Sequence, residues 1–304
     1  MFLEKYKMTT IGFIGTGRMG TPMIRNLIAA GYSLRVFNRT AAHTAEAVAA
    51  GATACATAAE TVDIDGIVLT MLADDAAVRA AMLGSHGILK TLGRGGVHVS
   101  MSTIAPATAC ELAALHQENG STYIAAPVFG RPDAAAAKKL WVCTSGDAAA
   151  KTRVRPVLEA LGQAVVDFGD RVESANVLKL CGNFMVAAAT EAMAEAFTLA
   201  EKAGVDKQAA LELLCGGVFA SPLYRNYGQS VVDMSHFPAK FLLRLGLKDL
   251  RLVRDAADQY GTPMPLADLV FNRLQSGVAK GRGELDWTGL ALGARDDAGL
   301  KAGV

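Results

Sequence analysis

The chain has 304 residues and is nearly balanced in charge, with 30 Lys and Arg against 29 Asp and Glu. This balance argues against nucleic acid or an anionic membrane as the main partner, because both favour a clustered basic excess. Hydrophobic residues make up 51% of the chain, which is enough for a sizeable buried core, and the length suits about two domains.

The cysteines and histidines give no sign of a disulfide framework or a metal site. The five cysteines are scattered without a CxxC pair, and no HExxH motif occurs, so we expect buried, reduced thiols and no bound metal. The first eight residues lack the apolar core of a secretory signal. The apolar stretch 177–200 contains Lys179, Asn183, Glu191 and Glu195, and a membrane span rarely carries four such groups. We therefore expect a buried helix in a soluble, cytoplasmic protein.

The first half of the chain alternates short apolar runs with Ala-rich helical stretches. This pattern is typical of βαβ units, which build a mostly parallel, doubly wound sheet with helices on both faces. The predicted strands are Thr10–Ile14, Ser33–Phe37, Gly66–Met71, Gly96–Ser100, Tyr123–Ala126, Leu140–Thr144 and Ala164–Asp167. The predicted helices between them are Gly20–Ala30, Thr40–Ala49, Asp75–Met82 and Thr108–Asn119.

After Asp170 the strand signal ends and only helical periodicity follows. The longest predicted helix is Glu173–Ala203, which would be about 46 Å long at 1.5 Å per residue. Shorter helices are predicted from about Lys207, Pro238, Leu247 and Pro265, and Arg282 and the run Arg295–Asp297 are interpreted as solvated charge. The sequence thus predicts an α/β domain over residues 1–171 and an all-α domain over residues 172–304, joined by the long helix.

A glycine-rich segment follows the first predicted strand and opens the first predicted helix. Its GxGxxG spacing is informative in this context, because the three glycines allow a tight turn, an approach of the backbone to a pyrophosphate, and close packing of the helix on the strand. The helix N-terminus offers N–H groups and a positive dipole to the same anion. We expect a Rossmann-type dinucleotide site here, a ligand-free turn being the alternative. The residues expected to contact the cofactor are Gly15, Thr16, Gly17, Arg18, Met19 and Gly20.

The end of the second predicted strand favours NADP(H) over NAD(H). A site that prefers NAD usually has an Asp or Glu here to hold the ribose 2′-hydroxyl. The chain has Asn38, Arg39 and Thr40 instead, and the planar cation of Arg39 suits a 2′-phosphate.

Later strand ends should line the same cleft, because ligands bind at the carboxyl ends of strands in such sheets. Met71 and Leu72 follow one strand, although core packing would also explain them. Ser102 and Thr103 follow the next strand, and they would alternatively cap the helix that comes after. A further strand ends in the kinked loop 126–132, whose backbone N–H groups are available to a ligand.

A lysine and an asparagine mark the predicted domain junction. Lys179 and Asn183 are four residues apart, so they share one face of the long helix. A lysine removed from water has a lowered pKa and becomes a competent proton donor near neutral pH. A lysine whose head reaches water is the alternative, and the spacing leaves both interpretations open. Further along, Lys248 and Asp249 form a pair that ordinary surface chemistry would explain.

Taken together, these segments resemble the β-hydroxyacid dehydrogenase family, which includes 3-hydroxyisobutyrate dehydrogenase and glyoxylate/succinic semialdehyde reductase. The resemblance extends from about Thr10 to Trp287. It rests on motifs in a fixed order, each similar to one of the family: the dinucleotide signature Gly12–Gly20, the Ser-Thr-x-x-Pro segment Ser102–Pro106, the loop Ala126–Gly130, the Lys-x-x-x-Asn of Lys179–Asn183, and the Lys-Asp of Lys248–Asp249.

The resemblance implies a Rossmann domain, an all-helical domain, and a homodimer or homotetramer. It also implies that Lys179 is the general acid and that Asn183 orients the substrate or that lysine. Lys248 is implied at the nicotinamide end of the cofactor, and Thr103 is expected at the cofactor as well. The cofactor contacts expected from the strand ends are Asn38, Arg39, Thr40, Met71 and Leu72. The substrate contacts that we expect are Ser102, Thr103, Val128, Phe129, Gly130, Arg131, Phe241 and Asp249.

Three departures from the family pattern concern the predicted pocket. Phe129 replaces the loop serine, Arg131 replaces the glycine that follows, and Ser100 stands where an acid usually precedes Ser-Thr. A hydroxyl donor is therefore lost, while an aromatic wall and a possible carboxylate clamp are gained.

These observations predict an NADPH-dependent reductase of small aldehydes or keto acids, with a semialdehyde such as succinic semialdehyde or glyoxylate as the expected substrate. A 3-hydroxyisobutyrate- or serine-type dehydrogenase that works oxidatively is the second interpretation. A non-catalytic dinucleotide-binding protein is a third, although it would be expected to have lost Lys179 or Asn183. An imine reductase is a fourth, and that group typically lacks this lysine.

Overall fold

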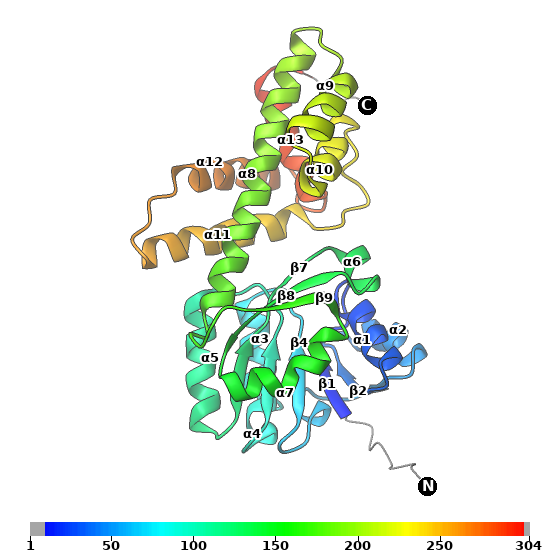
Figure 1. Ribbon diagram of the computed structural model, residues 1–304, viewed down its shortest axis with the longest axis vertical. Helices are drawn as coiled ribbons and strands as arrows, with labels where there is room; N and C mark the ends of the chain where they lie inside the picture. The colour runs from blue at the N-terminus through cyan, green and yellow to red at the C-terminus, as the bar shows by residue number, and fades with distance from the viewer. Residues whose placement is uncertain (1–9, 301–304) are drawn as a thin grey trace. The chain divides into compact units, whose positions relative to one another are not determined.

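The computed structural model describes residues 10–300. The chain forms two compact units, Met1–Lys179 and Leu180–Val304, and the division between them falls inside one long helix, α8 (Ser174–Lys202) (Figure 1).

The first unit is built on a mostly parallel sheet in the order β3-β2-β1-β4-β5-β6-β8-β7, with β9 paired to β8. The order reverses direction between β1 and β4, which is the point where open α/β sheets bind ligands. Strands β7 and β8 are antiparallel to each other, and so are β6 and β8. The strands are β1 (Thr10–Ile14), β2 (Ser33–Phe37), β3 (Thr53–Ala54), β4 (Ile67–Thr70), β5 (Val97–Ser100), β6 (Thr122–Ala125), β7 (Val128–Phe129), β8 (Leu140–Gly146) and β9 (Gly162–Asp167).

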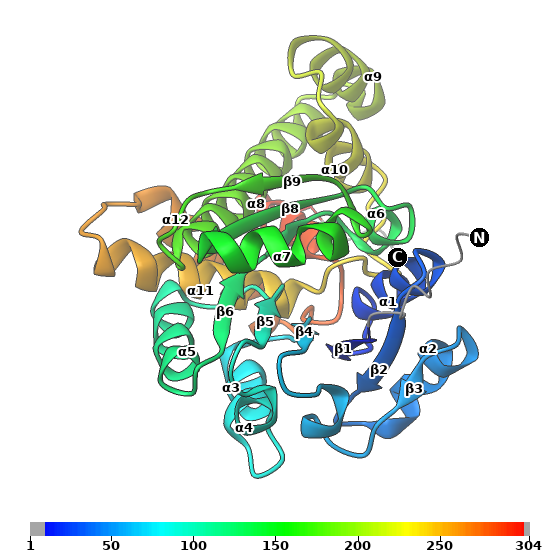
Figure 2. The ribbon, with the colours of Figure 1, turned by 60° about the horizontal axis from the view of Figure 1, so that its bottom comes forward.

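Helices cover both faces of this sheet. Apolar side chains of α1, α2 and α7 pack on one face, and those of α3, α4 and α5 pack on the other; Figure 2 shows α7 on one side of the strands with α3 and α4 opposite. Successive strand residues alternate between the two clusters, because neighbouring side chains of a strand point to opposite faces. The helices are α1 (Gly20–Ala29), α2 (Ala45–Ala49), α3 (Asp75–Leu83), α4 (Ile88–Leu92), α5 (Pro106–Glu118), α6 (Pro132–Ala136) and α7 (Ala148–Glu159).

A chain of buried polar groups crosses the second of these clusters. Thr70 Oγ1 lies 2.9 Å from His98 Nε2, His98 Nδ1 lies 3.0 Å from His116 Nε2, and His116 Nδ1 lies 2.7 Å from Ser121 Oγ. Burial lowers the pKa of both imidazoles, that of His116 to about 4. The two rings are therefore neutral at pH 7, and each is held by its neighbours through hydrogen bonds.

The second unit is helical. Besides α8 it contains α9 (Lys207–Leu213), the π-helical turn η3 (Leu214–Val218), α10 (Pro222–Val232), α11 (Leu243–Gln259), α12 (Pro265–Ala279), the 3-10 turn η4 (Trp287–Leu290) and α13 (Ala291–Asp297). Helices α11 and α12 pack against each other. Glu191 on α8 is 2% exposed and its Oε1 lies 2.7 Å from Arg273 Nε on α12. This ion pair compensates a carboxylate placed in a largely apolar helix.

By length and composition alone, α8 could cross a membrane, with 44% of its most apolar window buried. One such helix is weak evidence for a membrane protein, because core helices of globular proteins pass the same test.

Several details differ from the sequence predictions. No helix begins at Pro238, because the N–H groups of Lys240 and Phe241 donate to Asp286 Oδ2 in a loop, and α11 begins only at Leu243. The charges predicted as solvated are paired: Arg295 binds Glu201, and Arg282 binds Asp296.

The expectation of buried cysteines was also wrong in part. Cys143 and Cys215 are buried, whereas Cys110 and Cys181 are exposed and Cys55 is half-buried; all five thiols are free.

Candidate functional site

The glycine-rich turn lies between the end of β1 and the start of α1. The Gly15 N–H donates to Phe37 O at 2.9 Å, and the Met71 N–H donates to Ile14 O, also at 2.9 Å, so the ends of β1, β2 and β4 are tied together here. A Cβ on Gly15 would lie 2.2 Å from Met71 O, and a Cβ on Gly20 would lie 1.8 Å from Gly15 O. Both positions therefore need glycine for the fold itself.

Gly17 differs from its two neighbours in the motif. It is exposed, and a Cβ built on it meets no protein atom within 4 Å. The protein thus leaves open space beside this backbone at the start of α1, where N–H groups and the helix dipole favour an anion. An anion the size of a dinucleotide pyrophosphate would fit here; Thr16, Arg18 and Met19 adjoin Gly17 in the same turn.

The end of β2 forms the next part of this edge. Asn38 Oδ1 accepts from the Thr16 N–H at 3.3 Å, and Asn38 Nδ2 donates to Thr40 O at 3.0 Å. This amide links the glycine-rich turn to the segment after β2 and fixes its course. Arg39 and Thr40 are exposed, so a cation and a hydroxyl lie beside the turn at the end of β2.

The ends of β4 and β5 are joined by a side chain that the sequence had singled out. Ser102 Oγ, which is fully buried, accepts from the Leu72 N–H at 2.8 Å. The alternative role as a helix cap is wrong, because the N-cap of α5 is Ala105, whose side chain makes no capping hydrogen bond. The Ala105 N–H donates to Asp75 Oδ1 at 3.0 Å. Met71, Leu72 and Thr103 are half-buried along this edge.

The loop after β6 leads into β7 and carries two of the three departures from the family pattern. Val128 pairs with Val142 of β8, and its side chain lies in the core. Phe129 is half-buried, Gly130 is exposed and Arg131 is half-buried at the N-cap of α6. The aromatic ring thus stands at the rim of the core, at the carboxyl end of β6.

Lys179 lies beside this loop. Its Nζ is 4.3 Å from the centroid of the Phe129 ring, and the lysine is half-buried. The first turn of α8 is held in place by Ser145 of β8, whose Oγ accepts from the Ala175 N–H at 3.0 Å and donates to Val172 O at 2.7 Å. The lysine therefore lies at the same sheet edge as the glycine-rich turn, since β7 directly follows the carboxyl end of β6. Nothing in the sequence pattern had marked Ser145.

In the second unit, Asn183 and Asp249 are joined directly. Asn183 Nδ2 donates to Asp249 Oδ2 at 2.6 Å, and Asp249 Oδ1 lies 2.9 Å from Lys248 Nζ. Asp249 is 1% exposed, so these two partners compensate the loss of water around its charge. Lys248–Asp249 is therefore more than ordinary surface chemistry, because one of the two carboxylate oxygens is committed to Asn183.

Phe241, also in the second unit, is fixed by its surroundings. Its ring meets the ring of Trp287 edge-on, with the centroids 4.9 Å apart, and its N–H donates to Asp286 Oδ2 at 3.0 Å. The structure thus collects the predicted residues into two groups: the sheet-edge residues with Lys179 in the first unit, and Asn183, Phe241, Lys248 and Asp249 in the second.

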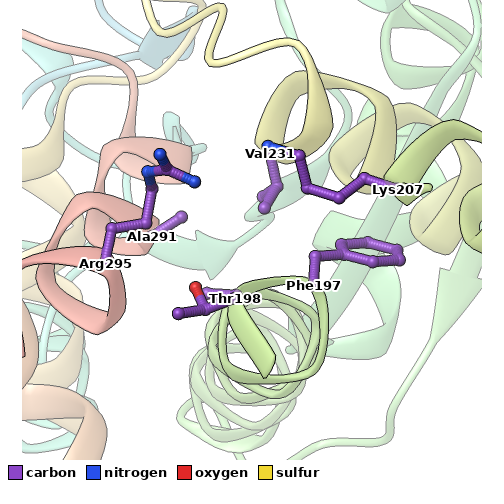
Figure 3. Close-up of a pocket in the computed structure, with 7 residues that line it drawn as sticks. Phe197, Thr198, Lys207, Val231, Ala291 and Arg295 are labelled. Atoms are coloured by element: carbon purple, nitrogen blue, oxygen red, sulfur yellow. The ribbon is translucent and has the colours of Figure 1, made fainter. Parts of the chain in front are cut away.

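A small pocket in the second unit is lined by none of the residues predicted to bind cofactor or substrate. Its volume of about 10 Å³ has room for about one water molecule. Lys207 and Arg295 line it (Figure 3), and both form ion pairs with Glu201. Such a pocket is too small for a dinucleotide or an organic acid. The lining residues are Ala194, Phe197, Thr198, Lys207, Val231, Ala291 and Arg295.

Comparison with known proteins agrees with the geometry of both units. Residues 10–169 match the NAD binding domain of 6-phosphogluconate dehydrogenase, and residues 174–292 match the NAD-binding domain of NADP-dependent 3-hydroxyisobutyrate dehydrogenase. An uncharacterized oxidoreductase of Bacillus subtilis, YfjR, is 42% identical over 280 residues, which are 92% of this chain and 98% of that protein. The 3-sulfolactaldehyde reductase of Escherichia coli is 31% identical over 98% of this chain and 99% of its own length.

A solved structure has the same architecture. The 3-hydroxyisobutyrate dehydrogenase of Mycobacterium tuberculosis, solved with L-serine, superposes with a TM-score of 0.85 at 30% identity, covering 95% of this chain and 99% of that one. Both the family models and these relatives extend over nearly the whole chain. The chain therefore belongs to the β-hydroxyacid dehydrogenase family of NAD(P)-dependent oxidoreductases, enzymes that act on small hydroxy acids and semialdehydes.

Proposed function

We propose that this protein uses NADPH to reduce a small aldehyde or keto acid to the hydroxy acid, with Lys179 as the general acid. The observation that carries the proposal is the position of Lys179 beside Phe129, at the sheet edge that also holds the glycine-rich turn. A proton donor and a cradle for a dinucleotide thus belong to one compact unit. An oxidoreductase that reduces a carbonyl group needs both.

The open space at Gly17 and the N-terminus of α1 would hold the pyrophosphate. Arg39 supports the choice of NADPH, because an exposed guanidinium beside the turn can bind a 2′-phosphate through two parallel hydrogen bonds. Asn38 carries no charge to oppose that phosphate, and its amide is used to bind the turn. Further proposed cofactor contacts are Thr16, Arg18, Met19, Thr40, Met71 and Leu72.

The chemistry divides between cofactor and protein. The reduced nicotinamide supplies a hydride to the carbonyl carbon when it is bound. Lys179 Nζ donates a proton to the carbonyl oxygen, so that the C=O bond becomes CH–OH and the lysine is left neutral until it takes a proton from water. Proton donation by a positioned side chain typically contributes about 10²–10⁴-fold to the rate.

The loop 128–131 and Thr103 are proposed to hold the acid group of the substrate. Arg131 suits a distal carboxylate, which a semialdehyde such as succinic semialdehyde carries, because a guanidinium binds carboxylates through two hydrogen bonds. Glyoxylate is shorter than succinic semialdehyde, so its turnover tests whether the carboxylate must lie far from the aldehyde group. The roles of Asn183, Phe241, Lys248 and Asp249 in binding substrate and cofactor, and that of Ser102, remain predictions from the resemblance.

We also propose a cytoplasmic homodimer or homotetramer with a nucleotide-binding domain over residues 1–171 and a helical domain over residues 172–304. Exposed apolar side chains in the second unit support self-association; among them are Met185 and Leu199 on α8 and Leu213 on α9. Sedimentation velocity on the full chain distinguishes a monomer from either oligomer.

The first experiment is a scan of NADPH consumption over C2–C4 semialdehydes and keto acids, with Lys179→Met beside the wild type. We expect Lys179→Met to bind NADPH within about twofold of the wild type and to lose about 10²–10⁴ in kcat. Lys202→Met, which removes a lysine from the far end of the same helix, is the control and should keep its turnover. Near-normal turnover by Lys179→Met would remove this residue from the reaction.

A second candidate is an oxidative 3-hydroxyisobutyrate- or serine-type dehydrogenase. The structural relative from Mycobacterium tuberculosis, solved with L-serine, favours testing it. Steady-state oxidation of both hydroxy acids with NAD⁺ and with NADP⁺ distinguishes the candidates, because the proposed reductase should give its highest kcat/KM with NADPH and a semialdehyde.

A further inference from the structure

A contact between an aromatic ring and the proposed proton donor distinguishes this chain from its family pattern. Phe129 stands where that pattern has serine, and its ring centroid lies 4.3 Å from Lys179 Nζ. An ammonium within about 6 Å of a ring centroid is attracted by the negative charge on the face of the ring. Lys179 is half-buried, and such an attraction is stronger where a cation is partly removed from water than at an open surface.

The ring and the lysine are each fixed by independent contacts. Phe129 pairs with Trp141 across β7 and β8, and its side chain packs against the core cluster that contains Cys143 and Ala175. The Ser145 hydroxyl holds the first turn of α8 against β8. The geometry of the pair is therefore set by the sheet and the helix, and neither partner depends on a flexible loop tip.

The positive charge of Lys179 also affects Cys143 on β8. Burial raises the pKa of the Cys143 thiol on β8, and the positive charge of Lys179 opposes that rise. The ammonium is thus close enough to β8 for its charge to act on the Cys143 thiol.

We propose that Phe129 is a positioning residue for the reaction, which holds the Lys179 ammonium over its ring at the point where the proton must be delivered. The proposal rests on the proposed function, since it assigns Phe129 a role through Lys179. In the family pattern a serine offers a hydroxyl at this place. Here an aromatic face fixes the cation instead, and the substrate meets an apolar wall.

A series of isosteric rings tests this role. Replacing Phe129 with 4-fluoro-, 3,5-difluoro- and 3,4,5-trifluorophenylalanine withdraws charge stepwise from the ring face while its shape is nearly kept. We expect kcat to fall with each added fluorine, by about three- to tenfold over the series, given the usual strength of such contacts, with the KM for NADPH unchanged. The same fluorinated residues at Phe168, an exposed position of the same unit, are the matched control and should leave kcat unchanged.

One natural substitution and a spectroscopic measurement complete the test. Phe129→Leu removes the ring and should lose about as much kcat as the trifluoro variant. In protein labelled with ¹³C at the lysine ε carbon, the Lys179 resonance, identified by its absence in Lys179→Met, should be shifted upfield by the ring current. The shift should vanish in Phe129→Leu.

The outcomes separate this inference from the proposed function. Equal kcat across the fluorinated series, with Lys179→Met inactive, would overturn the role of Phe129 and leave the lysine as proton donor. Normal turnover by Lys179→Met would overturn the proposed function, even if the ring-current shift were present. A Lys179 resonance at the position of ordinary surface lysines would overturn the contact itself.

Discussion

Gly17→Ala is the most discriminating substitution in the glycine-rich turn. The added methyl group meets no protein atom within 4 Å, so the folded chain should accept it, and we expect the free energy of unfolding to change by less than about 0.5 kcal/mol. The same methyl group occupies the open space where a pyrophosphate would approach the backbone. We expect the Kd for NADPH to rise about 10- to 100-fold, which corresponds to about 1.4–2.8 kcal/mol.

Gly20→Ala provides the contrast within the same motif. Its methyl group would lie 1.8 Å from Gly15 O. This clash is with a backbone atom, so it can be relieved only if the start of α1 moves away from the turn that follows β1. We expect this variant to lose several kcal/mol of stability, on the order of the largest single-residue effects. Its loss of NADPH binding would then follow from the loss of structure.

Isothermal titration with NADPH and urea unfolding monitored by circular dichroism measure the two quantities separately. Gly216→Ala, in η3, is the control, because a methyl group there also meets no protein atom within 4 Å. Its Kd and stability should both stay near the wild-type values. A folded Gly17→Ala protein that binds NADPH as tightly as the wild type would refute the placement of the pyrophosphate.

Two further predictions concern the cofactor and the buried histidines. Arg39→Gln should weaken NADPH binding about tenfold or more and leave NADH binding unchanged; equal losses for both cofactors in parallel titrations would contradict a 2′-phosphate contact. The free energy of unfolding should fall by about 1.4 kcal/mol per pH unit for each histidine as pH drops below 6.5. In this range His98 and His116 bind protons in the unfolded chain, whereas burial keeps both of them neutral in the folded protein. For His116 this loss ends near its folded pKa of about 4. Urea unfolding of His116→Gln between pH 7.5 and 5 should show a smaller slope, and an unchanged slope would locate the proton uptake elsewhere.

The sheet was predictable where the chain has regular, apolar strands. β1 and β2 match their predicted bounds residue for residue, since apolar runs bounded by glycine or polar turns mark them clearly. β3 and β7 have two residues each and offer no periodicity to detect. The helix α7 was not predicted, because Pro156 interrupts its pattern, although the Asp147 side chain caps its start.

The site was predictable only as separate motifs. The glycine spacing and the Lys179–Asn183 pair are local in sequence, so each could be identified from the residues alone. The hydrogen bond between Asn183 and Asp249 joins residues 66 positions apart, and no local pattern contains it. The contact of Lys179 with Phe129 likewise depends on the pairing of β7 with β8 and on the course of α8, which only tertiary structure fixes.

The hydrogen bonds in the chain of buried polar groups, Thr70, His98, His116 and Ser121, all run in one direction. Each neutral imidazole carries one hydrogen, and Ser121 Oγ donates to His116 O at 3.2 Å. Because the Ser121 hydroxyl hydrogen is donated to His116 O, Ser121 Oγ must accept the Nδ1–H of His116. His116 Nε2 must then accept the Nδ1–H of His98, and His98 Nε2 must accept the hydroxyl hydrogen of Thr70. The position of the Ser121 hydroxyl hydrogen thereby determines the tautomers of His116 and His98 and the orientation of the Thr70 hydroxyl. Loss of the Ser121 hydroxyl would remove this constraint, so that both rings and the threonine hydroxyl could reverse their hydrogen bonds together.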